Sequence, residues 1–371
     1  MNPLDHLHAH LNKHGAISFF DFMQHVLYAP SWGYYTRSRS PLGASGDFIT
    51  APELTPLFGY TLARQCEQIL QHLHQPILFE FGAGSGQLCV DLLTGLEQCD
   101  VLPSAYHILE ISASLKAQQQ NTITTQIPHL ADRVQWLSSW PEQAFEGVVI
   151  ANEVLDAMPV HRFLKTETGL LESMIGLDEH NNLIENFVPC SNTRLEAHVT
   201  RVLKHDIAPY ASEANLLIDG WIEACHTMLT RGAVLLLDYG FPEHEYYHPS
   251  RTQGTLMCHY QHKAHPNPLR HPGEEDITAH VDFTHVAEAA LNAGFKVSGY
   301  TNQASFLLAN GLLSLLEHSV GDAPTQIKQQ QAVKKLLQPH EMGELFKVIA
   351  LTKQLDFNLN GFQLHDKRAS L

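Results

Sequence analysis

The stretch that follows Pro76 constrains the fold most, because short apolar runs there alternate with helical patterns. These runs are apolar on both faces, which is typical of strands in a parallel sheet that is covered by helices on both sides. We therefore predict an α/β fold with a doubly wound sheet. Its strands are expected at residues 77–81, 106–109, 134–137, 147–151 and 233–237.

The remainder of the chain is expected to add segments to this sheet. With 371 residues the chain exceeds a minimal domain, so we expect two structural units or one unit with insertions. The long segment 241–277 shows little periodicity and is expected to be a loop that is either functional or disordered. The predicted bounds are an N-terminal helical cap segment at 1–75, a sheet domain at 76–165 and 214–354, a β-rich insertion at 166–213, a helical insertion at 302–340 and a C-terminal tail at 355–371.

Charge and hydropathy exclude two function classes. The chain has 23 Lys and Arg against 39 Asp and Glu, a formal net charge of -16, and it lacks a basic cluster. Nucleic acid binding depends on cations that neutralise phosphates, so nucleic acid is not expected as a partner. Spanning a bilayer takes roughly 20 consecutive apolar residues, and we expect no membrane insertion because no run approaches that length.

The six cysteines are scattered without a C-x-x-C pair, and we interpret them as reduced thiols. The sequence MNPLDHLHAHLNKHGAISFF has neither the apolar core of a signal peptide nor the Arg-rich composition of a presequence. Together these features predict a cytoplasmic protein.

A glycine-rich loop, FEFGAGSGQL, follows the first predicted strand and holds Gly82, Gly84 and Gly86. Residues without a Cβ at a strand-to-helix turn let a ligand approach the backbone. The spacing is G-x-G-x-G, whereas dinucleotide-binding loops read G-x-G-x-x-G and Gln87 breaks that pattern. The loop therefore favours S-adenosylmethionine as cofactor and disfavours a nicotinamide dehydrogenase. Tight turns of this type accept glycine without any ligand, so the loop alone does not establish a cofactor site.

Two acids complete the predicted cofactor site. Glu110 closes the run YHILE at the carboxyl end of the next strand, where a carboxylate can accept both ribose hydroxyls. Glu80 lies two residues before Gly82, just ahead of the glycines, and could pair with the amino group of the methionine moiety. The alternative for Glu80 is an ordinary solvated strand end.

The run GVVIANEVLDAMP places Asn152, Glu153 and Asp156 at the carboxyl edge of the sheet, where ligands of such folds bind. We predict that all three are catalytic and that Asn152 also orients the cofactor. Glu153 and Asp156 would share one face if the turn were helical. A guanidinium stays charged in water, so an enzyme that methylates it must hold it by carboxylates. The alternative is that both acids merely stabilise a helix N-terminus.

Several long motifs span nearly the whole chain and read GDFITAPELTPLFG, FEFGAGSGQL, ANEVLDAMPVHRF, LLLDYGF, GTLMCHYQHKAHPNPLRHPGEEDITAHVDF and GELFKVIALTK. Together they resemble the MidA-like S-adenosylmethionine-dependent methyltransferases, a family that includes a mitochondrial complex I assembly factor methylating an arginine. The resemblance implies a seven-stranded class I methyltransferase sheet whose last strand is antiparallel, with FKVSGY and FKVIAL as its final hairpin.

The same resemblance implies further site residues and a substrate. The acceptor is expected to be an arginine of a partner protein, such as a respiratory complex I subunit, and a homodimer is left open. Two alternatives are a non-catalytic assembly factor that keeps the cofactor-binding scaffold and a methyltransferase acting on small molecules. The implied pocket residues are Asp47, Phe48, Thr50 and Glu53 near the cofactor and substrate, with Asp238 and Tyr239 after the fifth strand.

The segment 241–277 contains several histidines and two acids, which are residue types that bind zinc, so a zinc site is one hypothesis. Because histidines occur throughout the chain, 25 in all, we predict that no metal is bound and that the segment is solvated or forms a lid. The residues concerned are His259, His262, His265, His271, Glu274 and Glu275.

Overall fold

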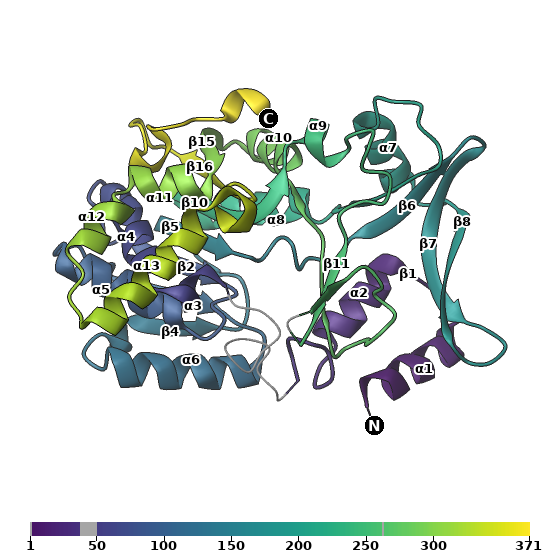
Figure 1. Cartoon of the computed structure of the whole chain (residues 1–371), viewed down its shortest axis with the longest axis horizontal. Helices are drawn as coiled ribbons and strands as arrows, with labels where there is room; N and C mark the ends of the chain where they lie inside the picture. The colour runs from purple at the N-terminus through teal and green to yellow at the C-terminus, as the bar shows by residue number, and fades with distance from the viewer. Residues whose placement is uncertain (1, 38–49, 262) are drawn as a thin grey trace. The chain divides into compact units, whose positions relative to one another are not determined.

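The computed structural model describes residues 2–37, 50–261 and 263–371, which divide into two compact units (Figure 1). Unit 1 comprises Met1–Phe48, Leu155–Ile218 and Phe241–Asp282, and unit 2 comprises Ile49–Val154, Asp219–Gly240 and Phe283–Leu371. The chain therefore enters each unit more than once. The domain bounds predicted from the sequence remain a prediction.

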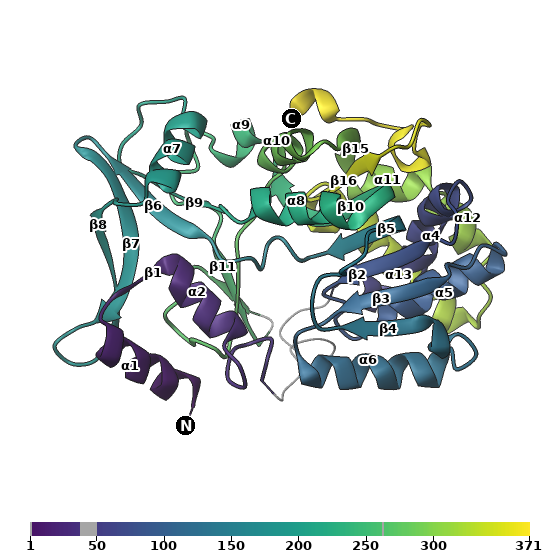
Figure 2. The same cartoon turned by 180° about the vertical axis from the view of Figure 1, so that it is seen from behind.

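Unit 2 is built on a mixed sheet with the strand order β15-β16-β10-β5-β2-β3-β4 (Figure 2). The strands from β10 to β4 pair in parallel, whereas β16 is antiparallel to both β10 and β15. The predicted α/β fold with an antiparallel last strand is thus confirmed. The order from β15 to β4 holds the seven predicted strands, and the two-residue β14 pairs with β10 as an eighth strand of the sheet. The bounds are β2 Ile77–Phe81, β3 Ala105–Leu109, β4 Val134–Leu137, β5 Phe145–Asn152, β10 Leu229–Phe241, β15 Lys296–Asn302 and β16 Phe346–Lys353.

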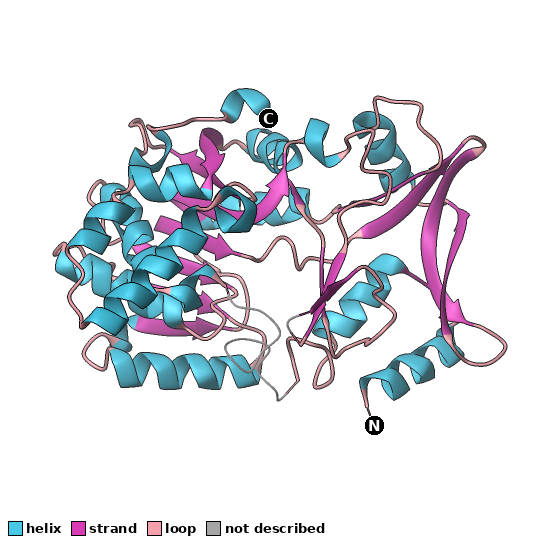
Figure 3. Cartoon of the chain, in the orientation of Figure 1, coloured by secondary structure: helices cyan, strands magenta, loops and turns pink. Residues whose placement is uncertain are grey.

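Both faces of this sheet are buried, as a doubly wound fold requires. Leu78 and Ile150 belong to a core shared with α4 and α5, and their neighbours Phe79 and Val149, which point to the opposite face, are also fully buried. Figure 3 shows the helices that surround the strands. They are α3 Ala51–Leu54, α4 Pro56–Leu70, α5 Gln87–Gln98, α6 Ala113–Gln126, α8 Ile218–Met228, α10 Phe283–Ala293, α11 Gln303–Ala309, α12 Leu312–Glu317 and α13 Ala323–Leu337, with short turns η1 Ala131–Arg133, η2 Pro339–Gly343, η3 Asn360–Phe362 and η4 Arg368–Ser370.

Unit 1 contains a five-stranded sheet in which the order β1-β7-β6-β9 is extended by β8 pairing with β7. The hydroxyl of Ser18 accepts a hydrogen bond from the backbone N–H of Asp21, so Ser18 caps α2. The elements are α1 Pro3–His14, β1 Ile17–Ser18, α2 Phe19–Tyr28, β6 His161–Thr166, β7 Gly169–Leu177, β8 Leu183–Pro189, α7 Thr193–Val202, β9 Tyr210–Ala214, α9 Glu243–Tyr246, β11 Met257–Tyr260, β12 Lys263–His265, β13 Asp276–Thr278 and β14 Val281–Asp282.

The segment 241–277 is not the loop that its sequence suggests. It holds the short helix α9 and contributes a three-stranded sheet in the order β12-β11-β13. These strands have only three or four residues, which is too few for an alternating pattern to be recognised.

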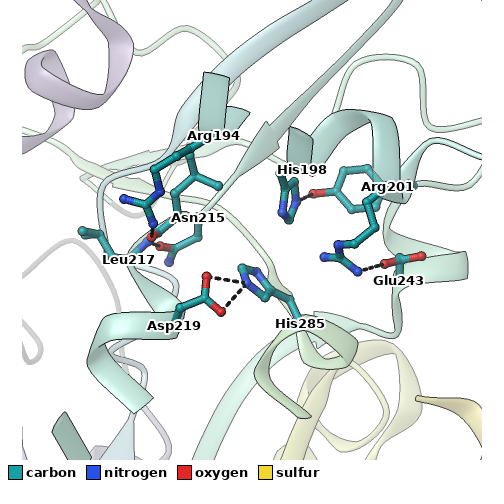
Figure 4. A network of polar contacts seen from close by, with 10 residues as sticks. Arg194, His198, Arg201, Asn215, Leu217, Asp219, Glu243 and His285 are labelled. Carbon is teal, nitrogen blue, oxygen red and sulfur yellow. Dashed lines mark hydrogen bonds and ion pairs between the residues drawn. The ribbon is translucent and has the colours of Figure 1, made fainter. Parts of the chain in front are cut away.

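Side-chain ion pairs join neighbouring elements within each unit (Figure 4). In unit 1 Arg201 of α7 lies 3.1 Å from the carboxylate of Glu243 in α9. In unit 2 His285 of α10 lies 3.3 Å from the carboxylate of Asp219 in α8. Partly exposed pairs of this kind contribute roughly 0–1 kcal/mol each, so buried apolar side chains remain the main source of stability. Within the described residues, we find no helix with the length and apolarity needed to cross a bilayer.

Candidate cofactor site

The glycine loop between β2 and α5 adopts a backbone that side chains rarely tolerate. Gly82, Gly84 and Gly86 have φ values of 61°, 54° and 87°. A Cβ at Gly82 would come within 3.1 Å of Val154, and one at Gly86 within 3.1 Å of the Cα of Gln119. Residues with side chains would strain this turn, so the loop keeps open backbone at the carboxyl end of β2. The glycine loop therefore suits a ligand that approaches the main chain closely.

Glu110 follows β3, the strand next to β2, and its carboxylate is held from two sides. One carboxylate oxygen accepts a 2.8 Å hydrogen bond from the backbone N–H of Ser112, and the other accepts a 2.9 Å bond from the side-chain amide of Gln119. Burial raises the pKa of Glu110, while these hydrogen bonds act in the opposite direction. The carboxylate is therefore fixed in place at the sheet edge that carries the glycine loop.

Glu80 lies inside unit 2 and is not an ordinary solvated strand end. Its side chain is 2% exposed and accepts a 2.7 Å hydrogen bond from the hydroxyl of Tyr106. Burial raises the pKa of Glu80 to about 7, with the Tyr106 hydrogen bond opposing that shift. A cation that reached this carboxyl group would stabilise its ionised form.

The tip of β5 carries Asn152 and Glu153. Glu153 has a left-handed φ of 53°, and its N–H donates to the carbonyl of Leu237 in β10 at 2.9 Å. The Asn152 amide donates weakly to the Glu153 carboxylate at 3.3 Å, and its carbonyl oxygen is buried without a hydrogen-bond partner among the described residues. A left-handed glutamate costs about 1 kcal/mol or more, and such backbone is concentrated at functional sites. An unsatisfied buried oxygen next to it is consistent with a ligand-binding position.

The helical turn considered for Glu153 and Asp156 does not form. The left-handed backbone at Glu153 interrupts any helix, and residues 153–160 contain only bends, turns and irregular backbone. Glu153 belongs to unit 2, whereas Asp156 belongs to unit 1. There Asp156 is 4% exposed, and its backbone carbonyl accepts a hydrogen bond from Ala279 at 3.0 Å.

The residues implied after the fifth strand lie near the end of β10. Leu237 is level with Asn152 in the parallel pairing of β10 and β5, and Asp238 follows it. Asp238 is 1% exposed and accepts the N–H of Tyr239 at 2.9 Å. The ring of Tyr239 makes an edge contact with Phe346, with centroids 5.4 Å apart. Both residues thus lie in the carboxyl half of β10, the strand next to β5.

The implied N-terminal pocket residues are only partly described. Thr50 occupies the N-cap position of α3, and Glu53 lies in that helix. The hydroxyl of Ser85 in the glycine loop donates a hydrogen bond to the Glu53 carboxylate. Glu53 is therefore in direct contact with the loop. Asp47 and Phe48 lie outside the described residues.

Three residues of this site escaped the sequence analysis. Ser85 contacts Glu53, Tyr106 contacts Glu80, and Gln119 contacts both Glu110 and the carbonyl of Gly84. Gln119 occurs in a run of three glutamines on α6, a helix without a clear apolar face. Nothing in its pattern distinguishes it from the glutamines on either side, so only the geometry identifies it.

The histidine-rich segment has contacts that explain part of its composition. His265 lies 2.9 Å from the buried carboxylate of Glu275, and His271 stacks on Tyr260 with centroids 4.1 Å apart. Within residues 2–37, 50–261 and 263–371, no group of three or more His, Cys, Asp or Glu side chains is arranged to hold a metal ion. His262 lies outside the described residues.

Comparisons with known proteins identify the family. The family model of S-adenosyl-L-methionine-dependent methyltransferases matches residues 61–301. This chain belongs to that family. A crystal structure of a Burkholderia thailandensis protein bound to S-adenosyl-homocysteine is 41% identical, with a TM-score of 0.95, and the match covers 100% of this chain and 96% of that one. The cofactor of this methyltransferase is therefore S-adenosylmethionine.

Curated relatives match nearly the whole of this chain. The rat protein named protein arginine methyltransferase NDUFAF7, mitochondrial, is 29% identical over 94% of this chain and 84% of its own. The human protein of the same name is 28% identical over 94% of this chain and 82% of its own.

These relatives overturn the cytoplasmic location predicted from the sequence. They are mitochondrial proteins by name. Unpaired cysteines fit any reducing compartment, and the six cysteines are indeed free thiols.

Proposed function

We propose that this methyltransferase transfers a methyl group from S-adenosylmethionine to an arginine side chain of a partner protein. The names of the curated relatives support this acceptor. The net charge of -16 also supports it, because an acidic surface attracts a basic segment of a substrate protein.

The observation that carries the proposal is the carboxylate of Glu153 at the tip of β5. This strand pairs with β2, which leads into the glycine loop. The bound cofactor supplies an electrophilic methyl group. Glu153 would hold the planar guanidinium through charge-assisted hydrogen bonds and aim one nitrogen at that methyl group. Such a site works by positioning and electrostatics, without a covalent enzyme intermediate.

The other residues at this edge take roles in binding. We assign ribose binding to Glu110, the amino group of the methionine moiety to Glu80, and close backbone approach to Gly82, Gly84 and Gly86. Asn152 would use its unsatisfied carbonyl oxygen to orient the cofactor or the acceptor. Asp156 remains a proposed second catalytic carboxylate, and Asp47, Phe48, Thr50, Glu53, Asp238 and Tyr239 remain proposed pocket residues.

Glu153→Gln tests the acceptor role. The amide cannot neutralise a guanidinium, so we expect methyl transfer to fall by roughly 100-fold or more while cofactor affinity changes by less than about threefold. In the assay, the wild-type protein or the variant is added with labelled cofactor to an extract from cells that lack this gene. Mass spectrometry then locates the labelled residue. Glu179→Gln, an exposed position in the β7–β8 turn, is the matched control and should leave transfer unchanged.

The same assay separates the alternatives. Label found only in metabolites would contradict a protein acceptor and indicate a small-molecule methyltransferase. No label in any fraction, together with partner binding that survives Glu153→Gln, would instead indicate an assembly factor that keeps the cofactor-binding scaffold. Label on a protein side chain other than arginine would contradict the arginine assignment alone.

A further inference from the structure

Gln119 of α6 connects the two parts of the cofactor site. Its side chain is completely buried. The amide nitrogen donates to the carbonyl of Gly84 at 3.0 Å and to the carboxylate of Glu110 at 2.9 Å, and the amide oxygen accepts the indole N–H of Trp136 at 2.9 Å. One side chain thus bridges the glycine loop, the acid after β3 and the strand β4.

The orientation of this amide is determined by its partners. The indole N–H of Trp136 can only donate, so the group facing it must be the oxygen of Gln119. The amide nitrogen then faces two acceptors, the Gly84 carbonyl and the Glu110 carboxylate, which match its two hydrogens. Among the standard side chains only Gln and Asn carry an amide with one acceptor oxygen and two donor hydrogens, and Asn is shorter by one methylene group.

We infer that Gln119 is a positioning residue that sets the affinity of this enzyme for the cofactor's ribose. This inference depends on the proposed role of Glu110 in binding the ribose hydroxyls. A bidentate contact requires that the carboxylate be held at a fixed distance and angle from the loop that holds the remainder of the cofactor. Gln119 fixes both at once, because it bonds to Glu110 and Gly84 with the same nitrogen.

The requirement for glycine at position 86 follows partly from the same residue. A Cβ at Gly86 would lie 3.1 Å from the Cα and 3.4 Å from the Cβ of Gln119. Real Cβ contacts are rarely so close, so the loop and α6 approach each other only because position 86 has no side chain. This close approach brings the Gln119 amide within reach of the Gly84 carbonyl.

The test measures binding rather than turnover. Calorimetry of the full chain gives the affinities for S-adenosyl-homocysteine and for its 2′-deoxy analogue, and their ratio reports ribose recognition. Because Gln119→Leu removes a hydrogen bond to a charged carboxylate, it should weaken S-adenosyl-homocysteine binding by roughly 10-fold or more. The affinity ratio of the two ligands should fall toward one. Gln120→Leu, an exposed neighbour on α6, should change neither quantity.

A second variant covers the case in which Gln119→Leu does not fold. Gln119→Glu keeps the acceptor for Trp136 but places a carboxylate against Glu110. We expect its affinity for S-adenosyl-homocysteine to rise relative to the wild type as the pH is lowered, because a protonated Glu at position 119 can again donate to Glu110. A residue that only fills space would show no such pH profile.

The outcomes are distinct. If Gln119→Leu weakens both ligands equally, or weakens neither, the positioning role is wrong. If Glu110→Ala also leaves the affinity ratio unchanged, the proposed role of Glu110 in ribose binding is wrong, and the inference about Gln119 is wrong with it. A ratio that collapses in Glu110→Ala but persists in Gln119→Leu overturns only the inference about Gln119.

Discussion

At the scale of single residues, the burial of Glu80 bears on its proposed role in cofactor binding. This carboxyl group is buried beside Tyr106 and has its pKa raised to about 7, so near neutral pH a large share of it is protonated. Its proposed partner, the amino group of the methionine moiety, can pair only with the ionised form. Cofactor binding should therefore be coupled to the loss of a proton.

We expect cofactor affinity to increase as the pH rises from 6 to 8, since Glu80 ionises across that range. Glu80→Gln should remove this dependence and weaken binding by roughly 10-fold at pH 8, a typical loss for a charge-assisted hydrogen bond. Calorimetry at several pH values measures both effects. Methylthioadenosine, which lacks the amino acid portion, serves as the control ligand and should bind with no such dependence. An equal pH dependence for both ligands would rule out the proposed partner.

The sequence predicted some residues of the site and not others, for a physical reason. Gly82, Gly84 and Gly86 could be recognised because a left-handed turn restricts the residue type. Glu110 could be recognised because it follows a strand at the carboxyl edge of the sheet. Gln119 could not be recognised, since its importance comes from tertiary contacts with Gly84, Glu110 and Trp136. The left-handed backbone of Glu153 could not be predicted from the sequence either, because glutamate rarely adopts that conformation.

At the scale of elements, the sheet could be predicted well. The runs at 77–81 and 134–137 coincide with β2 and β4, because buried parallel strands are apolar on both faces and stand out from their surroundings. The small strands β11, β12 and β13 could not be predicted, since strands this short form only through their partners.

The pairing of β5 with β2 depends on a missing side chain. A Cβ at Gly147 would lie 1.9 Å from the carbonyl oxygen of Ile77. Gly147→Ala must therefore separate the two strands that carry Asn152 and the glycine loop, and we expect the free energy of unfolding to fall by about 3 kcal/mol or more. Urea denaturation measures the loss. Gly220→Ala in α8, where a Cβ meets nothing within 4 Å, should be neutral or stabilising by roughly 0.5–1 kcal/mol. Equal stability of the two variants would contradict this account.

At the scale of the whole molecule, buried carboxyl groups make stability depend on pH. Burial raises the pKa of both Glu80 and Asp91 to about 7, from ordinary values of 4.5 and 3.8. The folded protein therefore holds these protons more tightly than the unfolded chain does. The free energy of unfolding should decrease as the pH rises from about 5 to about 7, because ionisation of the buried groups is disfavoured only in the folded state.

The double variant Glu80→Gln and Asp91→Asn isolates this contribution. Its stability relative to the wild type should increase by a few kcal/mol between pH 5 and pH 8, as judged by urea denaturation at each pH without cofactor. Subtracting the two curves removes the effect of histidines that titrate in the same range. A constant difference across this range would show that the carboxyl groups ionise freely in the folded state.

The position of β16 has a consequence for how the protein is made. This strand separates β10 from β15, yet it is synthesised after both. While the ribosome translates the residues between Phe241 and Phe346, the backbone N–H and C=O groups of β10 that pair with β16 in the folded protein lack that partner. Exposed strand edges recruit other chains, so the nascent protein passes through an aggregation-prone period that ends only when residues 346–353 close the gap.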